Sequence, residues 1–536
     1  MEGESPFRRH VAWGLCCVAY LIASPYFERL NNPNENVRVW ATRAVVTRHV
    51  LRIDEVERDW GWVNDKSKTD GHVFSSKAPG ASLMGVPVLW AHTKLRQLVG
   101  WPPPGKRATT FWLRLFVVKL PLCAFLLLFA RYAERVTGSP WARDTAVVAL
   151  GLGTLLYPYG NVFVGHALAA AAAFSAFILL DDDDARAAPE ARAGVGYRRM
   201  AGAGLLAGLT VMFEYQAVLV SAALAVYAVV RHRDRPSSLV AFVAGAGPPA
   251  VALGAYHTVL FGRPWRFPLG YVENPVFAAT AHRAGFHGLS LPHPAAFPAF
   301  LWSPAYGLFA FSPVLLLGVA ALVVLFVRGR PGDGARRDAA LVTAVCVLMF
   351  LFLAGMSNWR AGWCVGPRYI ATVAPFLILP MLKLWPRAQR RVHMQMDMID
   401  RWWLTALAVG LLIPSVVLNV VSGALYPHYP ESFDNPIFDL AFPLIDEGYA
   451  PYGLGWLLHL PGRWSLAPLG LVVAGALALV AAGGDARPRR MAAHLGLGIA
   501  VAALFFVALG AYGRTPRPGE ARAAAAVRAA WDPPRR

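Results

Sequence analysis

The sequence predicts an all-α, polytopic integral membrane protein with about thirteen transmembrane helices. Only 15% of its 536 residues are charged and 56% are hydrophobic, whereas a soluble domain carries about 25% charged residues. Apolar segments recur along the chain, most of them close to the roughly 20 residues that cross a bilayer. Arginine also collects in alternate loops between these segments, as the positive-inside rule describes. Together these observations indicate many membrane-spanning helices.

The basic character of the chain has the same origin. A formal net charge of +19 would suit nucleic acid, but the basic residues gather in short loops between apolar segments, so we expect no nucleic-acid partner. The five cysteines form no CxxC pair, and we interpret them as small buried hydrophobic residues. The sequence contains no Walker A motif, dinucleotide fingerprint or internal repeat.

The first apolar run covers residues 11–24 and follows Arg8 and Arg9. A signal peptide begins in the same way, but no clear A-x-A cleavage site follows the run. We therefore expect residues 1–27 to form a cytoplasmic tip and a retained first helix. This orientation places the polar segment at residues 28–110 outside the cytoplasm.

Twelve further apolar segments are expected to span the membrane. They cover residues 111–130, 145–158, 162–180, 201–213, 215–230, 239–260, 309–327, 339–355, 370–384, 402–421, 466–482 and 492–512. The two segments beside Glu214 are short, so they must form a tight or broken pair. Residues 81–91 are interpreted as an interfacial or re-entrant helix, because counting them as a span reverses the sides of the later loops.

These spans group into three parts after the polar segment. We expect a transmembrane module at residues 111–330 that includes an outside loop at 263–303, and C-terminal helices at residues 331–512. The tail at residues 513–536 is expected to lie outside as a disordered or weakly helical appendage.

Loop composition separates the two sides of the membrane. The Arg-rich loops expected in the cytoplasm cover residues 181–200, 231–236, 328–337, 385–401 and 485–490. The loops expected outside cover residues 31–110, 263–303, 357–368 and 424–464, and they are rich in Trp, Tyr, His and Pro. One face of the membrane would therefore carry every aromatic-rich loop.

The four aspartates at 181–184 adjoin a span at its cytoplasmic end and are interpreted as a solvated linker.

The first polar segment opens with a short helix. Apolar residues at helical spacing are Val37, Trp40, Ala41, Ala44 and Val45. Pro33 suits the first helical position and Asn32 the N-cap. The helix is too short and too charged to span, so we expect it on the membrane surface.

Three carboxylates of this segment are candidate catalytic groups. Glu35 could take a proton from an attacking hydroxyl, although as the third residue after Asn32 it would equally complete a capping box. Asp54 and Glu55 form a second candidate pair, and a solvated turn is their alternative interpretation.

Two cations suit an anionic headgroup. Lys77 precedes Ala78-Pro79-Gly80 and the short apolar helix, where it would bind a phosphate or serve as a snorkelling anchor. Arg368 shares a compact outside loop with Trp359, which suits an anion or an interfacial Trp/Arg belt. Trp302, in the preceding outside loop, is a candidate sugar contact.

Two ionisable residues lie in or beside apolar runs. An ionisable group at membrane depth is a functional candidate by default, which applies to Glu214 unless the helix pair breaks there and exposes it to water. His166 lies near the outside end of a span, where it could act as a ligand or base or be a hydrogen-bonded structural histidine.

The order of these features resembles the GT-C superfamily of membrane glycosyltransferases. The family 39 type is most similar, which includes protein O-mannosyltransferases and the bacterial lipid A aminoarabinose transferase. Those enzymes carry an Asp-Glu pair at the start of the loop helix, where this chain has Asn34-Glu35, and a Lys-Pro-Pro-Leu-like motif where it has Lys77-Ala78-Pro79-Gly80. The second large outside loop also fits, and the resemblance covers roughly the first 330 residues.

The resemblance implies transfer of a sugar from a polyprenyl-phosphate donor to a lipid, glycan or protein acceptor on the outer face of the plasma membrane. It places Asn34, Lys77 and His166 near the substrate. The family's Asp, usually taken as the base, is Asn34 here, and a second family acid is replaced by His166. A divalent metal ion is left open as a cofactor, because no ligand cluster requires one.

Two other functions are compatible with the sequence. A transporter or flippase for a lipid-linked solute would explain the many spans and Glu214 without catalysis. A non-catalytic GT-C-like protein of envelope assembly would explain why an amide stands at Asn34.

Overall fold

The computed structural model describes residues 6–30, 32–181, 189–279, 285–328, 334–392, 399–482, 488–512 and 517–531. The structure is 74% helical. Within the described ranges the one sheet is an antiparallel hairpin of β1 (Lys66–Thr69) and β2 (His72–Ser75). The predicted all-α class is confirmed.

The helices named below have the following bounds. They are α1 (Pro6–Ile22), α2 (Pro33–Arg48), α3 (Asp54–Trp60), α4 (Gly80–Leu98), α5 (Lys106–Leu113), η1 (Arg114–Lys119), α6 (Leu120–Thr137), α7 (Pro140–Leu152), α8 (Leu156–Gly160), α9 (His166–Asp181), α10 (Pro189–Phe213), η2 (Tyr215–Ala217), α11 (Val218–His232), α12 (Pro236–Phe261), η3 (Pro268–Tyr271), α13 (Pro275–Phe277), α14 (Ala296–Trp302), α15 (Leu308–Phe311), α16 (Leu315–Arg328), α17 (Gly334–Gly355), η5 (Arg368–Ile370), α18 (Val373–Val392), α19 (Ile399–Leu425), η6 (Ile437–Ala441), α20 (Phe442–Asp446), α21 (Leu454–Leu457), η7 (Gly462–Leu466), α22 (Ala467–Ala482), α23 (Pro488–Ala511) and α24 (Glu520–Ala530).

Helices that could cross a membrane occur along most of the described chain. Among the described residues, 7 helices are long and apolar enough to cross a bilayer: Lys106–Thr137, Tyr215–His232, Pro236–Phe261, Gly334–Gly355, Thr405–Leu425, Gly462–Ala482 and Ala492–Ala511. Shorter apolar helices cover His166–Asp181, Leu315–Arg328 and Val373–Trp385. The protein is therefore an integral membrane protein, and the predicted count of thirteen spans is not established.

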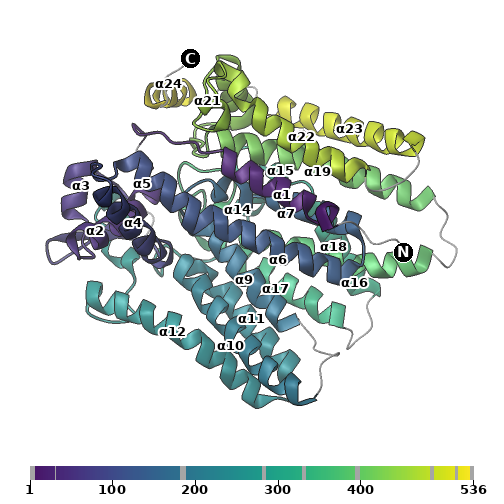
Figure 1. The fold of residues 1–536 in the computed structure, drawn as a ribbon, viewed down its shortest axis with the longest axis horizontal. Helices are drawn as coiled ribbons and strands as arrows, with labels where there is room; N and C mark the ends of the chain where they lie inside the picture. Colours follow the sequence, from purple (N-terminus) through teal and green to yellow (C-terminus); the bar gives the residue numbers. More distant parts are fainter. Residues whose placement is uncertain are drawn as a thin grey trace.

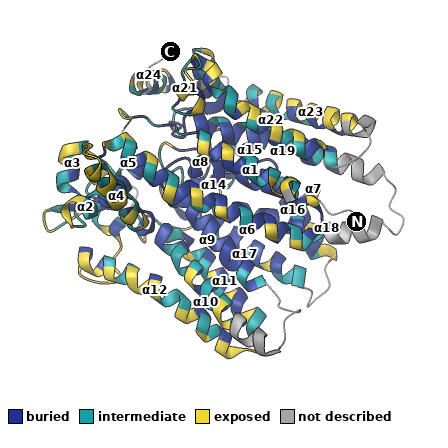
Figure 2. Cartoon of the chain, viewed as in Figure 1, coloured by how far each residue is buried: buried dark blue, intermediate teal, exposed yellow. Residues whose placement is uncertain are grey.

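The helices form an elongated array with a buried centre. In Figure 1, α10 and α12 lie along one edge, α22 and α23 along the opposite edge, and α2, α3, α4 and α5 cluster at one end. Figure 2 shows dark blue, buried residues concentrated in central helices such as α9, while α12 and α23 carry much exposed surface. Nearly all of α9 is buried, as expected of a helix that is apolar on every face.

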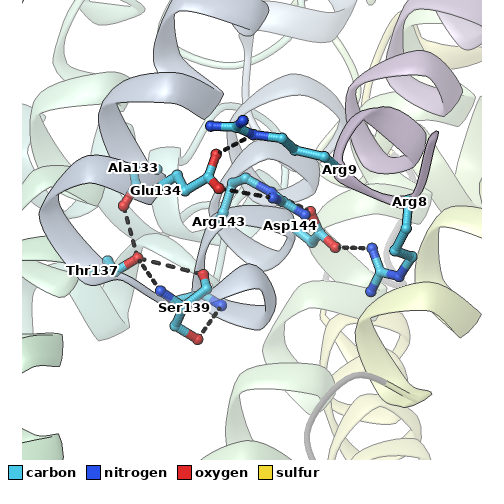
Figure 3. A network of polar contacts seen from close by, with 9 residues as sticks. Arg8, Arg9, Ala133, Glu134, Thr137, Ser139, Arg143 and Asp144 are labelled. Carbon is cyan, nitrogen blue, oxygen red and sulfur yellow. Dashed lines mark hydrogen bonds and ion pairs between the residues drawn. The ribbon is translucent and has the colours of Figure 1, made fainter. Parts of the chain in front are cut away.

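Ion pairs join the helix ends near the N-terminus (Figure 3). Arg8 of α1 reaches Asp144 of α7 at 2.5 Å, and Arg9 reaches Glu134 of α6 at 2.8 Å. Arg143 lies between these acids, 2.9 Å from Asp144 and 3.6 Å from Glu134. The contacts tie α1 to the turn between α6 and α7.

A second polar network joins α6, α9, α11, α17 and α18. The Lys383 ammonium lies 2.6 Å from Asp181 and 2.8 Å from Asp338. Tyr132 donates a hydrogen bond to Asp181, and Tyr227 donates one to Asp338, both at 2.7 Å. Asp181 was expected in a solvated linker, but its side chain is only 9% exposed and is paired with Lys383 and Tyr132. The other three aspartates, at 182–184, lie outside the described residues.

Two expectations about polar segments are corrected. Helix α2 does not present a polar face to water like a surface helix, because Asn34, Glu35 and Arg38 are as buried as its apolar residues. Within residues 517–531, the tail is an ordered helix rather than an appendage. Trp531 is 4% exposed, and its ring lies 5.0 Å from that of Phe27.

Close packing of α10 against α12 depends on a glycine. A Cβ atom added at Gly245 would lie 1.9 Å from the carbonyl oxygen of Ala201 in α10, whereas nothing lies within 4 Å of a Cβ at Gly247. We predict that Gly245→Ala forces the helices apart at a cost of about 1–3 kcal/mol and lowers the thermal unfolding midpoint in detergent.

Gly247→Ala is the matched control on the same helix. It places the same methyl group in open space and gains helix propensity, which is worth about 1 kcal/mol. Its midpoint should stay equal to or above that of the unchanged protein. Equal midpoints for the two variants would contradict the close approach of α10 and α12.

Candidate active site

The helix break at Glu214 organises the site. Helix α10 ends at Phe213, and Glu214 is extended, with φ −148° and ψ 121°, so the predicted broken pair is confirmed. A Cβ atom at Gly165 would lie 2.0 Å from the Phe213 carbonyl oxygen, and one at Gly80 would lie 2.6 Å from that of Met212. These two glycines therefore let the start of α4 and the segment before α9 close directly on the break.

Arg38 of α2 is the partner of Glu214. Its side chain is 1% exposed, and its Nη2 atom donates to the Glu214 Oε1 atom at 2.9 Å. Its Nη1 atom donates to the backbone carbonyl of Asn34 at 2.8 Å and also to the Asn34 side-chain oxygen. Asn34 therefore orients Arg38, and its neutral amide leaves the Arg38 charge available to Glu214.

His166 approaches the same carboxylate from the start of α9. Its Nδ1 atom lies 3.3 Å from the Glu214 Oε1 atom, but the ring is not aligned for a hydrogen bond, and neither ring nitrogen makes one. The rings of Tyr159 and Tyr369 meet the imidazole edge-on, with centroids 5.1 and 6.2 Å away. His166 is only 2% exposed, so its unbonded nitrogens lie in a packed, polar site.

Lys77 contributes a second cation, paired with Asp65. The Lys77 Nζ atom lies 3.1 Å from the Asp65 Oδ2 atom. Burial lowers the pKa of Lys77, and the nearby charges of Arg368 and Arg38 lower it further, although Asp65 opposes them. Burial also opposes ionisation of Asp65, but Lys77 and Arg368 together lower its pKa. Lys77 and Asp65 therefore form a pair beside Arg368.

Residues 268–274 contact the neighbours of Asp65. Next to Asp65, Asn64 accepts a hydrogen bond from Asn274 at 2.8 Å, and Ser67 donates one to the carbonyl of Pro268, also at 2.8 Å. Residues 268–274, within the segment 263–303, thus pack against the β-hairpin and the residues before it. The two polar loops form one structure around the site.

Arg368 completes a set of three cations. It lies at the start of η5, is 9% exposed, and its charge acts on both Asp65 and Lys77. The Nε atoms of Arg368 and Arg38 have no hydrogen-bond partner. Arg38, Lys77 and Arg368 outnumber the carboxylates of Asp65 and Glu214. A buried cluster with excess positive charge and unused donors suits an anionic ligand.

Glu35 belongs to a different, closed arrangement. Its carboxylate accepts two hydrogen bonds of 2.6 Å from the guanidinium of Arg114 in η1. It accepts a third, also of 2.6 Å, from the backbone N–H of Phe163. Burial opposes its ionisation, but Arg114 outweighs burial and lowers the pKa. Asn32 caps α2 as predicted, whereas the Glu35 side chain bonds Arg114 instead of completing a capping box. Its catalytic role stays a prediction, and its geometry favours a positioning role.

The Asp54 and Glu55 pair lies at a surface groove of about 530 Å³ that Arg52, Lys68 and His72 also line. Asp54 accepts the backbone N–H of Val73 at 3.3 Å, and Glu55 pairs with Arg48 at 2.9 Å. These contacts do not bring the pair to Arg38 or Lys77.

The two predicted tryptophans differ in position. The hydroxyl of Tyr306 donates to the backbone carbonyl of Trp359 at 2.7 Å, and Arg368 influences the same tyrosine, so Trp359 adjoins the cluster. Trp302 is 55% exposed and packs on Phe309. Among the described residues, no group of three His, Cys, Asp or Glu side chains could hold a metal ion.

Sequence reasoning did not single out Arg38 or Asp65. Arg38 could have been found from its spacing, because it stands four residues after Asn34 and therefore on the same helix face. Nothing in the sequence marks Asp65 among the acids of its loop.

No protein-family model and no curated protein matches the chain. The fold is distantly similar to ArnT from Cupriavidus metallidurans bound to undecaprenyl phosphate, at 15% identity and a TM-score of 0.42 over 94% of this chain and 77% of that one. It is also similar to the Archaeoglobus fulgidus oligosaccharyltransferase, at 11% identity and 0.44 over 80% and 56% of the two chains. Arabinosyltransferase EmbB from Mycobacterium smegmatis follows, at 13% and 0.46 over 95% and 40%.

Similarities this distant leave the reaction to be inferred from the site residues themselves.

Removing the Glu35 charge should destabilise the fold. Glu35→Gln leaves Arg114, whose side chain is 3% exposed, buried without a counter-charge, at a cost of about 3–5 kcal/mol. Because the pKa of Glu35 is lowered in the folded protein, its stabilisation is present above the ordinary carboxyl pKa of about 4.3 and is lost as pH falls below it. Unfolding midpoints at about pH 7 and about pH 4 measure both effects.

Glu55→Gln is the control, because its pair with Arg48 is exposed and worth about 0–1 kcal/mol. A Glu35→Gln protein as stable as this control, but inactive in sugar transfer, would instead return Glu35 to a catalytic role.

Proposed function

We propose that the protein is a membrane glycosyltransferase that moves a sugar from a polyprenyl-phosphate donor to a hydroxyl acceptor. The observation that carries the proposal is the buried cluster of Arg38, Lys77 and Arg368. In an integral membrane protein, a cationic site of this kind suits an anionic headgroup whose apolar chain lies among the helices. A polyprenyl phosphate has this chemistry.

Sugar transfer from such a donor needs the charges that the cluster offers. As the bond between the anomeric carbon and the phosphate oxygen breaks, negative charge grows on the leaving phosphate. Positioned cations lower the energy of that charge without reorganisation. Lys77 and Arg368 are the proposed phosphate ligands. Arg38, held by Asn34 and Glu214, provides fixed positive charge beside them.

The remaining predicted residues have supporting places in this proposal. Trp359 adjoins the cluster and would contact the sugar, while Glu35 positions α2 against η1. Asp54, Glu55 and Trp302 remain alternative contacts for the acceptor.

We propose that the N-terminus lies in the cytoplasm and the site on the outer side of the plasma membrane. The reason is that the sequence assigns the Arg-rich loops to the side of the membrane opposite the polar loops that form the site. A lipid, glycan or protein acceptor is compatible with this placement.

A turnover assay tests the proposed function. Purified protein in lipid is incubated with a panel of radiolabelled undecaprenyl-phosphate sugars and a mixed membrane-lipid and glycan acceptor extract. Movement of label from one donor to an acceptor is the expected result, and the active donor identifies the sugar. Tight donor binding with no transfer would favour the flippase, and no binding of any donor would overturn the proposal.

Lys77 should contribute directly to phosphate binding. We predict that Lys77→Ala raises the Kd for undecaprenyl phosphate about 10-fold or more, since a charged hydrogen bond is worth about 1.5–3 kcal/mol. Lys68→Ala is the control, because Lys68 is exposed on β1 of the same hairpin. Its Kd should stay within about 2-fold, since solvent-exposed charges contribute little. An unchanged Kd for Lys77→Ala would assign Lys77 to membrane anchoring.

A further inference from the structure

The site contains one buried ionisable group whose hydrogen-bonding capacity is unused. Neither ring nitrogen of His166 makes a hydrogen bond, although its Nδ1 atom lies 3.3 Å from the Glu214 carboxylate. Glu214 is itself held by Arg38 at 2.9 Å. A chain of contacts therefore runs from α2 through the break after α10 to the first residue of α9. It has the arrangement of a base whose orientation a carboxylate controls.

The other acids at the site are less suited to accept a proton. Asn34 carries a neutral amide. Glu35 is occupied by Arg114 and the Phe163 N–H, and Asp65 is paired with Lys77. The negative charge of each of these two carboxylates already interacts with a cation. This interaction makes the carboxylate a poorer proton acceptor. Both ring nitrogens of His166, in contrast, have no hydrogen-bond partner in the described part of the chain.

We propose that His166 is the proton acceptor of the transfer reaction and that Glu214 is its positioning residue, an inference that rests on the proposed function. The acceptor oxygen forms a bond to the anomeric carbon of the sugar. The bond from that carbon to the phosphate oxygen breaks, and its electron pair leaves with the polyprenyl phosphate. The hydroxyl proton passes to the Nε2 atom of His166, while Nδ1–H faces Glu214. After product release, the proton moves to water.

The groups around the ring act on its protonation in opposite directions. Glu214 faces it from the break after α10, and the positive groups acting on it are Arg368 of η5, Arg38 of α2 and Lys77 before α4. The uncharged rings of Tyr159 and Tyr369 cover its edges. Glu214, 3.3 Å away, favours the imidazolium form, whereas burial and the three cations oppose it. A poorly aligned contact in the absence of substrate is common for catalytic pairs and tightens in the substrate complex.

Turnover, binding and pH dependence together test the proposal. With the undecaprenyl-phosphate sugar that the unchanged protein uses, His166→Gln should lower turnover by about 100-fold or more, the range for loss of a general base. Its Kd for undecaprenyl phosphate should stay within about 2-fold, because His166 is not a phosphate ligand. Glu214→Gln should move the acidic limb of the pH–rate profile down by about one unit, because an opposite charge no longer favours the imidazolium.

Control variants separate a chemical role from a structural one. His494→Gln removes another buried histidine, on α23, and should leave turnover unchanged. A His166→Gln protein with normal turnover, or a Glu214→Gln protein with an unmoved acidic limb, would overturn the inference and leave the glycosyltransferase standing. Loss of turnover in Asp65→Asn but not in His166→Gln would move the base to Asp65. No turnover of any donor by the unchanged protein would overturn the proposed function and this inference together.

Discussion

The pairing of buried charges between distant segments holds the site together, and Arg38 with Glu214 is the pair on which the rest depends. Removing an ion from water costs several kcal/mol even after relaxation, so a buried arginine requires a carboxylate nearby. Glu214 can pair with Arg38 because the chain leaves the helical conformation between α10 and η2. The pair therefore ties the first polar loop to the membrane helices, and the approach of Lys77 and His166 follows from it.

The charged groups at the two ends of the helix array differ in how completely they are paired. At one end, Lys383 lies between Asp181 and Asp338, and two tyrosines donate to the same acids. These groups satisfy one another, as expected of a structural tie. At the other end, the three cations exceed the two carboxylates, and donors of Arg38 and Arg368 remain unused. This difference is the reason for proposing a binding site at one end of the array, whereas the contacts at the other end hold helices together.

The amide at Asn34 has a physical consequence that extends beyond the loss of an acid. An aspartate there would compete with Glu214 for Arg38, since Asn34 already contacts the guanidinium through its side chain. With the amide, Arg38 gives its full charge to Glu214, and Glu214 in turn lies beside His166. The amide at position 34 is thus linked through Arg38 and Glu214 to the histidine at position 166.

The sequence by itself determined the class of the protein, most helix positions and the break at Glu214, because hydrophobic content and periodicity are local properties of the chain. It also identified Lys77, His166 and Arg368 as candidates from their positions beside apolar runs, and Asn34 from a family resemblance. It did not determine their partners. Arg38 and Glu214 are 176 residues apart in the chain, and Glu35 is 79 residues from Arg114. Only the packing of helices and loops brings such groups together, and whether a carboxylate can accept a proton depends on those neighbours. The tertiary structure therefore decided that Glu35 is tied to Arg114, that Asp65 joins the cluster, and that the nitrogens of His166 remain available.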